Sequence, residues 1–160
     1  METEYLDTPE RAIAAHKWML RRRSENGTTV FTMKTPGDGY VRGEWESRKE
    51  NLHEAVRELV RLGAPKELTE ITANGVERTC GVEFLRQTAV VACGGMRCAL
   101  CLDYGTLRGG ARRRPFCEVE LELAAGDMAQ MLSLAAYLRQ TYGLREETRS
   151  KFVRAAELAD

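Results

Sequence analysis

A strictly alternating segment in the C-terminal half restricts the fold more than any other feature of the sequence. In CEVELEL (residues 117–123), glutamates alternate with apolar residues. Because successive side chains of a strand point to opposite faces, Glu118, Glu120 and Glu122 share one face. Neighbouring carboxylates repel one another unless solvent, basic partners or a metal ion offset their charge. The segment therefore predicts a strand whose charged face needs a partner.

Similar charged faces recur in other segments with a period of two. A hairpin over residues 19–34 with its turn at Asn26 and Gly27, a strand over 40–47, and two strands joined at Gly94 and Gly95 are predicted. Charged residues then share faces in these groups: Arg21 with Arg23, Thr32 with Lys34, Arg42 with Glu44 and Glu46, and Arg97 with Asp103. On an open sheet these faces would simply be solvated. In a closed barrel, basic strands would stand across from acidic strands, an interior that suits phosphate chains and hard divalent cations.

Two longer segments have the apolar period of helices. Residues 51–63 (NLHEAVRELVRLG) predict an amphipathic helix. Residues 126–143 predict a second helix, whose stripe of Met128, Met131, Leu132, Ala135 and Leu138 we expect to pack on the sheet. We expect residues 106–115 (TLRGGARRRP) to form a flexible surface loop, and residues 146–160 to form a helix or a strand running into one.

Composition limits the classes of partner. Lys plus Arg and Asp plus Glu number 24 each, so no net charge favours a nucleic acid, and we expect no specific nucleic-acid partner. No apolar run approaches the ~20 residues of a membrane helix, and the acidic start is unlike a signal peptide. The five cysteines are an odd number, which favours reduced thiols. We therefore expect a cytoplasmic protein without membrane attachment, folded as a single domain over residues 1–160.

Six segments, in order, resemble the CYTH family, the triphosphate tunnel metalloenzymes. They are YLDTPERAIAAHKWMLRRR, FTMKTPG, VRGEWE, LDYG, CEVELEL and SKFVRA, and they extend over nearly the whole chain. The resemblance implies an α+β fold, in which an antiparallel β-barrel or tunnel, of eight strands in the family, has helices packed outside. It also implies that a triphosphate is hydrolysed or otherwise processed with Mg²⁺ or Mn²⁺. Among subfamilies the chain is most similar to the bacterial inorganic triphosphatases, although thiamine-triphosphatase-like and class IV adenylate-cyclase-like members share the same motifs.

The resemblance also assigns residues to a substrate site and a metal site. The residues that match the family's phosphate-binding positions are Arg21, Arg23, Lys34, Arg42, Arg86 and Lys151. Those that match its acidic, metal-binding positions are Glu118 and Glu120, with Glu122 as a supporting partner, and Asp103, Glu44 and Glu46. Glu118, Glu120 and Lys34 would take part in catalysis. The implied mechanism is electrostatic, because bound metal would bridge phosphate oxygens and position a water while Arg and Lys neutralise charge.

One part of the family pattern is missing. The family begins with an ExExK strand and a helix, whereas here Glu2 and Glu4 stand immediately before YLDTP, with Leu6 in place of the lysine. We therefore expect a domain truncated at its N-terminus relative to the family. Removing one strand from a barrel exposes two edges, so we expect an open tunnel or one that a homodimer completes.

The function stays open among three readings. The first is a metal-dependent phosphohydrolase that acts on inorganic triphosphate or an organic triphosphate. The second is a non-catalytic or weakly active module that binds polyphosphate or nucleotide, because the missing strand would remove part of the family's carboxylate set. The third is an enzyme like the class IV adenylate cyclases.

Overall fold

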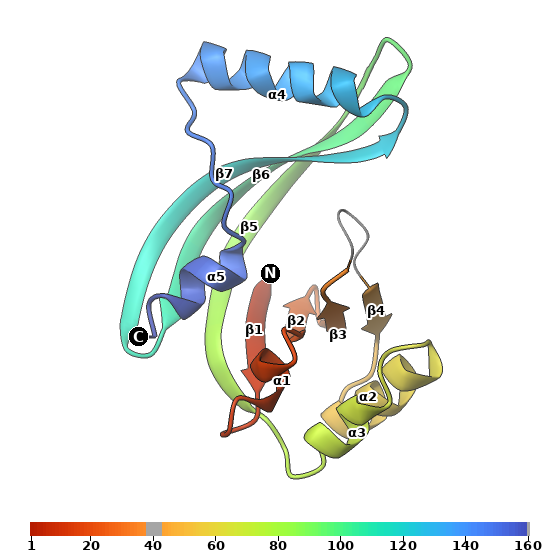
Figure 1. Ribbon diagram of the computed structural model, residues 1–160. Helices are drawn as coiled ribbons and strands as arrows, with labels where there is room; N and C mark the ends of the chain where they lie inside the picture. Colours follow the sequence, from red (N-terminus) through yellow and green to blue (C-terminus); the bar gives the residue numbers. More distant parts are fainter. Residues whose placement is uncertain (38–42, 160) are drawn as a thin grey trace.

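Seven antiparallel strands form one curled sheet in the computed structural model, which describes residues 1–37 and 43–159 (Figure 1). The strand order is β4-β3-β2-β1-β5-β6-β7. The strands are β1 (Glu2–Asp7), β2 (Met19–Glu25), β3 (Thr28–Thr35), β4 (Gly43–Ser47), β5 (Glu77–Cys93), β6 (Met96–Gly109) and β7 (Arg112–Ala125). Within the described residues β4 and β7 each pair on one side, so the sheet is an open half-barrel, as the sequence predicts.

Tight turns at glycine join the hairpins. Asn26 and Gly27 both have positive φ (50° and 78°), which suits the two-residue turn between β2 and β3. Gly110, with φ of 54°, allows an equally short turn between β6 and β7, where Gly109 pairs with Arg112. The expected loop over residues 106–115 is therefore wrong. The two strands continue almost to the turn, and the run of arginines begins β7.

The first three helices cover the convex face of β2 and β3. They are α1 (Ala12–Ala15), α2 (Leu52–Arg61) and α3 (Glu67–Ile71). The side chains that point outward from β2 and β3 pack against them in a core of Ile13, Leu20, Phe31, Met33, Ala55, Val56, Leu59, Ala64 and Leu68. The Asn51 side chain caps α2 by accepting a hydrogen bond of 3.0 Å from the Glu54 backbone N–H. The predicted amphipathic helix is confirmed.

The long helix α4 (Met128–Tyr142) crosses β5, β6 and β7 at the end of the sheet where the turn joins β5 to β6 (Figure 1). The Asp127 side chain caps its start, and Gly143, with φ of 62°, ends it. In α4, all of which is described, no side chain is buried, and Leu132 is 59 % exposed. The helix is confirmed, and it contacts β6 and β7 of the sheet. No residue of its apolar stripe is buried, however, because only one sheet layer lies beneath it at this end of the strands. No described helix has the length and apolar content needed to cross a membrane.

The last helix, α5 (Lys151–Ala156), lies inside the curl of the sheet (Figure 1). Its Phe152 ring is 4.8 Å from the ring of Tyr5, and its Ala155 is fully buried against Val82 and Leu107 of the concave face. A Cβ at Gly109 would lie 2.4 Å from the carbonyl oxygen of Ala155. Glycine at this position of β6 therefore allows the close approach that directs the first residues of α5 into the half-barrel.

Candidate functional site

The concave face of the half-barrel encloses a cavity of about 960 Å³. One side of the cavity is formed by β2, β3 and β4, and the other by β5, β7 and α5. The predicted site residues that line it are Arg21, Arg23, Lys34, Glu44, Glu46, Arg86, Glu120, Glu122 and Lys151. The structure therefore brings the predicted basic and acidic strands to one cavity. Arg42, also predicted to bind phosphate, lies outside the described residues.

Three carboxylates of the β6–β7 side form what we call the acidic triad: Asp103, Glu118 and Glu120. Asp103 pairs in register with Glu118, so both side chains point to the concave face. One oxygen of each triad residue lies within 4.8 Å of the others, and Asp103 is fully buried. Carboxylate oxygens that converge in this way are the ligands that Mg²⁺ and Mn²⁺ prefer, so the triad fits a divalent cation.

Arg86 of β5 holds the acidic triad from one side. Its Nε donates to Asp103 Oδ1 and its Nη2 to Asp103 Oδ2, both at 2.7 Å, in a bidentate fork. It also donates to Glu120 at 2.5 Å and to Glu122 at 3.0 Å. The hydrogen bonds to Asp103 raise the pKa of Arg86 above its ordinary value against the effect of burial. Arg86, predicted to bind phosphate, is therefore engaged with carboxylates in this structure.

Lys151 lies at the point on which the acidic triad converges. Its Nζ is 2.7 Å from Asp103 Oδ2 and 2.6 Å from Glu120 Oε1, and it also forms an ion pair with Glu118. Burial would lower the pKa of Lys151, but the hydrogen bonds with the three carboxylates raise it above its ordinary value. Burial would likewise raise the pKa values of Asp103 and Glu120, yet hydrogen bonds from Arg86 and Lys151 keep both low. Lys151, Asp103 and Glu120 are therefore charged near neutral pH.

Arg154 is a further residue of this side that the sequence analysis missed. It is buried and forms an ion pair with Glu118. Its guanidinium carbon lies 5.5 Å from the ring centroid of Phe116, and Lys151 Nζ lies 5.1 Å from that of Phe84, so aromatic faces support both cations. Its distance in sequence from Lys151 could have identified it, because residues three apart lie on one face of a helix.

The opposite side of the cavity is basic, with Arg21, Arg23 and Lys34 as its cations. Lys34 Nζ lies 2.9 Å from Glu44 Oε2, and Glu46 lies 3.9 Å from Arg21 and 3.8 Å from Arg23. Glu44 and Glu46, predicted as metal ligands, thus pair with these cations and do not join the acidic triad.

Two arginine donors on the basic side are unsatisfied. The Nε atoms of Arg21 and Arg23 are buried and have no hydrogen-bond partner within the described part of the chain. A buried donor without an acceptor is costly, so these two groups need one. Both side chains line the cavity, which makes an anionic ligand in the cavity a suitable acceptor.

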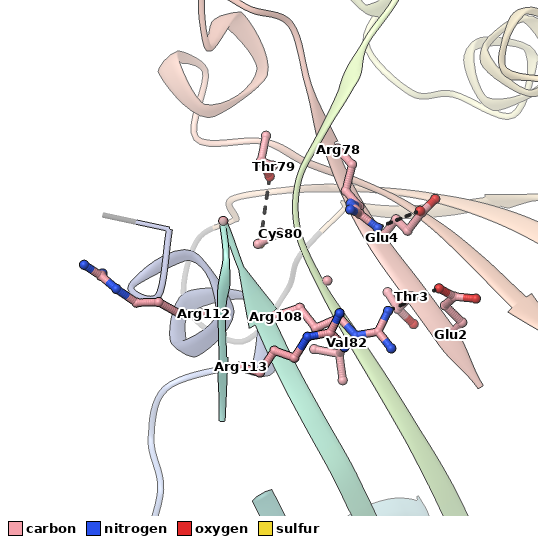
Figure 2. A pocket seen from close by; sticks show the side chains of 12 residues that line it. Glu2, Thr3, Glu4, Arg78, Thr79, Cys80, Val82, Arg108, Arg112 and Arg113 are labelled. Atoms are coloured by element: carbon pink, nitrogen blue, oxygen red, sulfur yellow. Dashed lines mark hydrogen bonds and ion pairs between the residues drawn. The ribbon is translucent and has the colours of Figure 1, made fainter. Parts of the chain in front are cut away.

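A second, smaller pocket of about 200 Å³ lies between β1, β5 and the β6–β7 turn (Figure 2). Two of its four arginines pair with nearby glutamates: Arg78 lies 3.6 Å from Glu4, and Arg108 lies 3.8 Å from Glu2 and also pairs with Glu83. None of the described residues that line it belongs to the predicted site. The large concave cavity is therefore the candidate functional site.

Comparison with known proteins agrees with this geometry. The CYTH domain family matches residues 2–156 of the sequence. The chain belongs to the CYTH family. This family covers triphosphatases and adenylate-cyclase-like enzymes, which usually act on triphosphates and typically use divalent cations.

A solved CYTH-type structure has the same fold. It is the crystal structure of a protein from Bacillus halodurans described as a "putative adenylate cyclase". The match has a TM-score of 0.59 and 16 % sequence identity, and it covers 96 % of this chain and 80 % of that one. The predicted fold class, an antiparallel CYTH-type half-barrel with helices packed outside, is confirmed, although the short α5 enters the concave side.

Proposed function

We propose that this CYTH protein is a phosphohydrolase that cleaves a terminal phosphoanhydride bond of inorganic triphosphate or of an organic triphosphate, with Mg²⁺ or Mn²⁺ as its cofactor. The observation that carries the proposal is the pairing of two features across one cavity. Buried, unsatisfied Nε donors of Arg21 and Arg23 lie on one side, and Glu120, which lines the other side, belongs to the three converging carboxylates. A triphosphate needs both, because its dense negative charge suits arginine donors and its oxygens suit a hard cation.

The roles of the residues follow from their positions. Arg21, Arg23 and Lys34 would hold the phosphate chain and neutralise charge as the terminal phosphoryl group departs. A divalent cation held by Asp103, Glu118 and Glu120 would supply Lewis-acid stabilisation of the phosphate oxygens and a positioned water. Glu44 and Glu46 orient the basic side chains, and Glu122 acts on the triad through Arg86. This chemistry requires no nucleophilic side chain.

The proposal extends to the assembly and its location. In the described part of the chain, β4 and β7 each have one unpaired edge, and these edges support a homodimer that completes the sheet, because an unpaired strand edge favours association with another chain. We propose the cytoplasm as the location, on the basis of the composition and the odd number of cysteines.

A second candidate function is a module that binds polyphosphate or nucleotide without turning it over. One observation favours it: the four carboxylates Asp103, Glu118, Glu120 and Glu122 are already held by cations of the chain, namely Arg86, Lys151 and Arg154. If these ion pairs persist when substrate binds, the cavity would hold phosphate but would lack the cation that hydrolysis needs.

Phosphate release separates the candidates. The purified chain is incubated with tripolyphosphate, ATP or thiamine triphosphate, with and without Mg²⁺ or Mn²⁺. We predict metal-dependent release that falls at least about 100-fold in a Glu118→Gln/Glu120→Gln double variant, as when transition-state stabilisation is removed. Glu83→Gln is the matched control, because Glu83 is an exposed strand glutamate that pairs with Arg108 away from the cavity.

Each other outcome has a defined meaning. Tripolyphosphate binding without release would establish the binding module, and conversion of ATP to cyclic AMP and pyrophosphate would establish the cyclase-like activity. Equal release by the wild type and the double variant would contradict the assignment of the two glutamates.

A further inference from the structure

Lys151 occupies the position that a cofactor cation would need, and this placement leads to a new inference. We propose that a divalent cation and the Lys151 ammonium exchange at the same three carboxylates, and that the displaced ammonium then binds the phosphate of the substrate. Lys151 would thus neutralise the acidic triad in the metal-free protein and bind phosphate in the metal-bound protein. This inference rests on the proposed function, since it concerns the same cavity.

The contacts of Lys151 show why the two cations compete. The Nζ atom touches one oxygen of each member of the acidic triad, and the side chain is only 12 % exposed. Those three residues are also the described group whose oxygens converge closely enough to hold a metal ion. A divalent cation therefore cannot take the three oxygens while the ammonium remains among them.

The local charge shows why the exchange is favourable. Four carboxylates, counting Glu122, face three cations, Arg86, Lys151 and Arg154, so one negative charge is left over. A divalent cation in place of the ammonium would remove that excess. The Asp103 and Glu118 side chains are only 0 % and 15 % exposed, so an uncompensated charge beside them costs more than it would at the surface.

Lys151 is better suited to exchange than its two neighbours. Arg86 is held by a bidentate fork to Asp103 and by two further carboxylates, so several hydrogen bonds must break to release it. Arg154 pairs with Glu118 among the described carboxylates, so its release would leave the oxygens of Asp103 and Glu120 occupied by Lys151. Lys151 instead carries its charge on one ammonium group at the end of a flexible side chain. A change of side-chain rotamer can therefore move the charge while the backbone of α5 stays in place.

The cavity offers the released ammonium a place to go. Lys151 lines the same cavity as Arg21, Arg23 and Lys34, so its head group can reach a phosphate chain held by the basic side. Metal binding would then free the Lys151 ammonium to donate hydrogen bonds to phosphate. The metal ion and the triphosphate would therefore bind with positive coupling. Such coupling is reciprocal, because each ligand must raise the affinity for the other by the same factor.

The test compares two affinities, for Mn²⁺ and for tripolyphosphate, which substitution of Lys151 should change in opposite directions. Mn²⁺ binding is measured by calorimetry on the wild type and on Lys151→Met, and tripolyphosphate binding is then measured at saturating Mn²⁺. We expect Lys151→Met to bind Mn²⁺ about tenfold more tightly and to bind tripolyphosphate about tenfold more weakly. Methionine keeps an apolar stem against Phe84 and Phe116, which preserves the packing of α5.

Two control variants isolate the exchange. Lys151→Arg keeps the positive charge at the triad, so Mn²⁺ affinity should stay near the wild-type value. Lys34→Met removes a cation from the opposite side, where its partner is Glu44, so it should weaken tripolyphosphate binding without tightening Mn²⁺ binding. Mn²⁺ binding that is unchanged or weaker in Lys151→Met would overturn the exchange.

The outcome also separates this inference from the proposed function. A wild type that binds Mn²⁺ and tripolyphosphate, with Lys151→Met unchanged in both, would overturn the exchange alone. A wild type that binds no tripolyphosphate under any condition would contradict the proposed function. Tighter Mn²⁺ binding by Lys151→Met would even then support the competition for the triad.

Discussion

Asp103 is the residue on which the acidic side of the cavity depends. It is fully buried and accepts hydrogen bonds from both Arg86 and Lys151, which lie 2.7 Å from its oxygens. A buried carboxylate is tolerated only when such partners compensate its lost hydration, and removing one member of a buried charge network leaves the others uncompensated. Asp103 should therefore contribute to stability as well as to metal binding.

Asp103→Asn tests this contribution. We predict that it lowers the free energy of unfolding by about 3 kcal/mol, because Arg86 and Lys151 lose the charge that holds them in a buried position. Chemical denaturation in the absence of metal provides the measurement. Glu122→Gln is the control and should cost less than about 1 kcal/mol, since that side chain is 57 % exposed. Equal losses in the two variants would count against the structural role of Asp103.

The helices show what an apolar period can and cannot predict. The pattern identifies both α2 and α4 as helices, but it does not say what each helix packs against. α2 buries Ala55, Val56 and Leu59 against the convex face, whereas the Met128 and Leu132 positions of α4 stay exposed. The difference arises from where each helix meets the sheet, which depends on strand lengths and turns far away in the sequence.

The two helices should therefore differ in local stability. We predict that backbone amides of α4 exchange with solvent much faster than those of α2, because few buried contacts oppose the opening of α4. Hydrogen–deuterium exchange by mass spectrometry compares them within one sample. Similar protection in both helices would show that α4 is covered, and repeating the experiment over a range of protein concentrations would reveal whether self-association covers it.

For the whole molecule, the period of two predicted more than any other signal. It placed Arg21 and Arg23 on one face and Glu118, Glu120 and Glu122 on another. All of these residues except Glu118 line the concave cavity, and Glu118 lies beside Glu120 in the acidic triad. The period of two could not predict that Lys151 and Arg154 return to the triad, because that contact depends on how α5 enters the half-barrel beside Gly109. The arginine-rich turn was missed for a related reason, since Gly110 allows the strands to continue where composition indicated a loop.

The central claim is that triphosphate binds in the concave cavity through the basic side, and calorimetric titration with tripolyphosphate tests it most directly. The variants are Arg21→Ala/Arg23→Ala and, as a control from the same strand, Arg22→Ala, whose side chain pairs with Glu4 on the opposite face. Each lost charged hydrogen bond is worth about 1.5–3 kcal/mol, so the double variant should bind at least about 100-fold more weakly. The Arg22→Ala variant should stay within about twofold of the wild type, because Arg22 does not line the cavity. Unchanged affinity in the double variant, or an equal loss in Arg22→Ala, would contradict the claim.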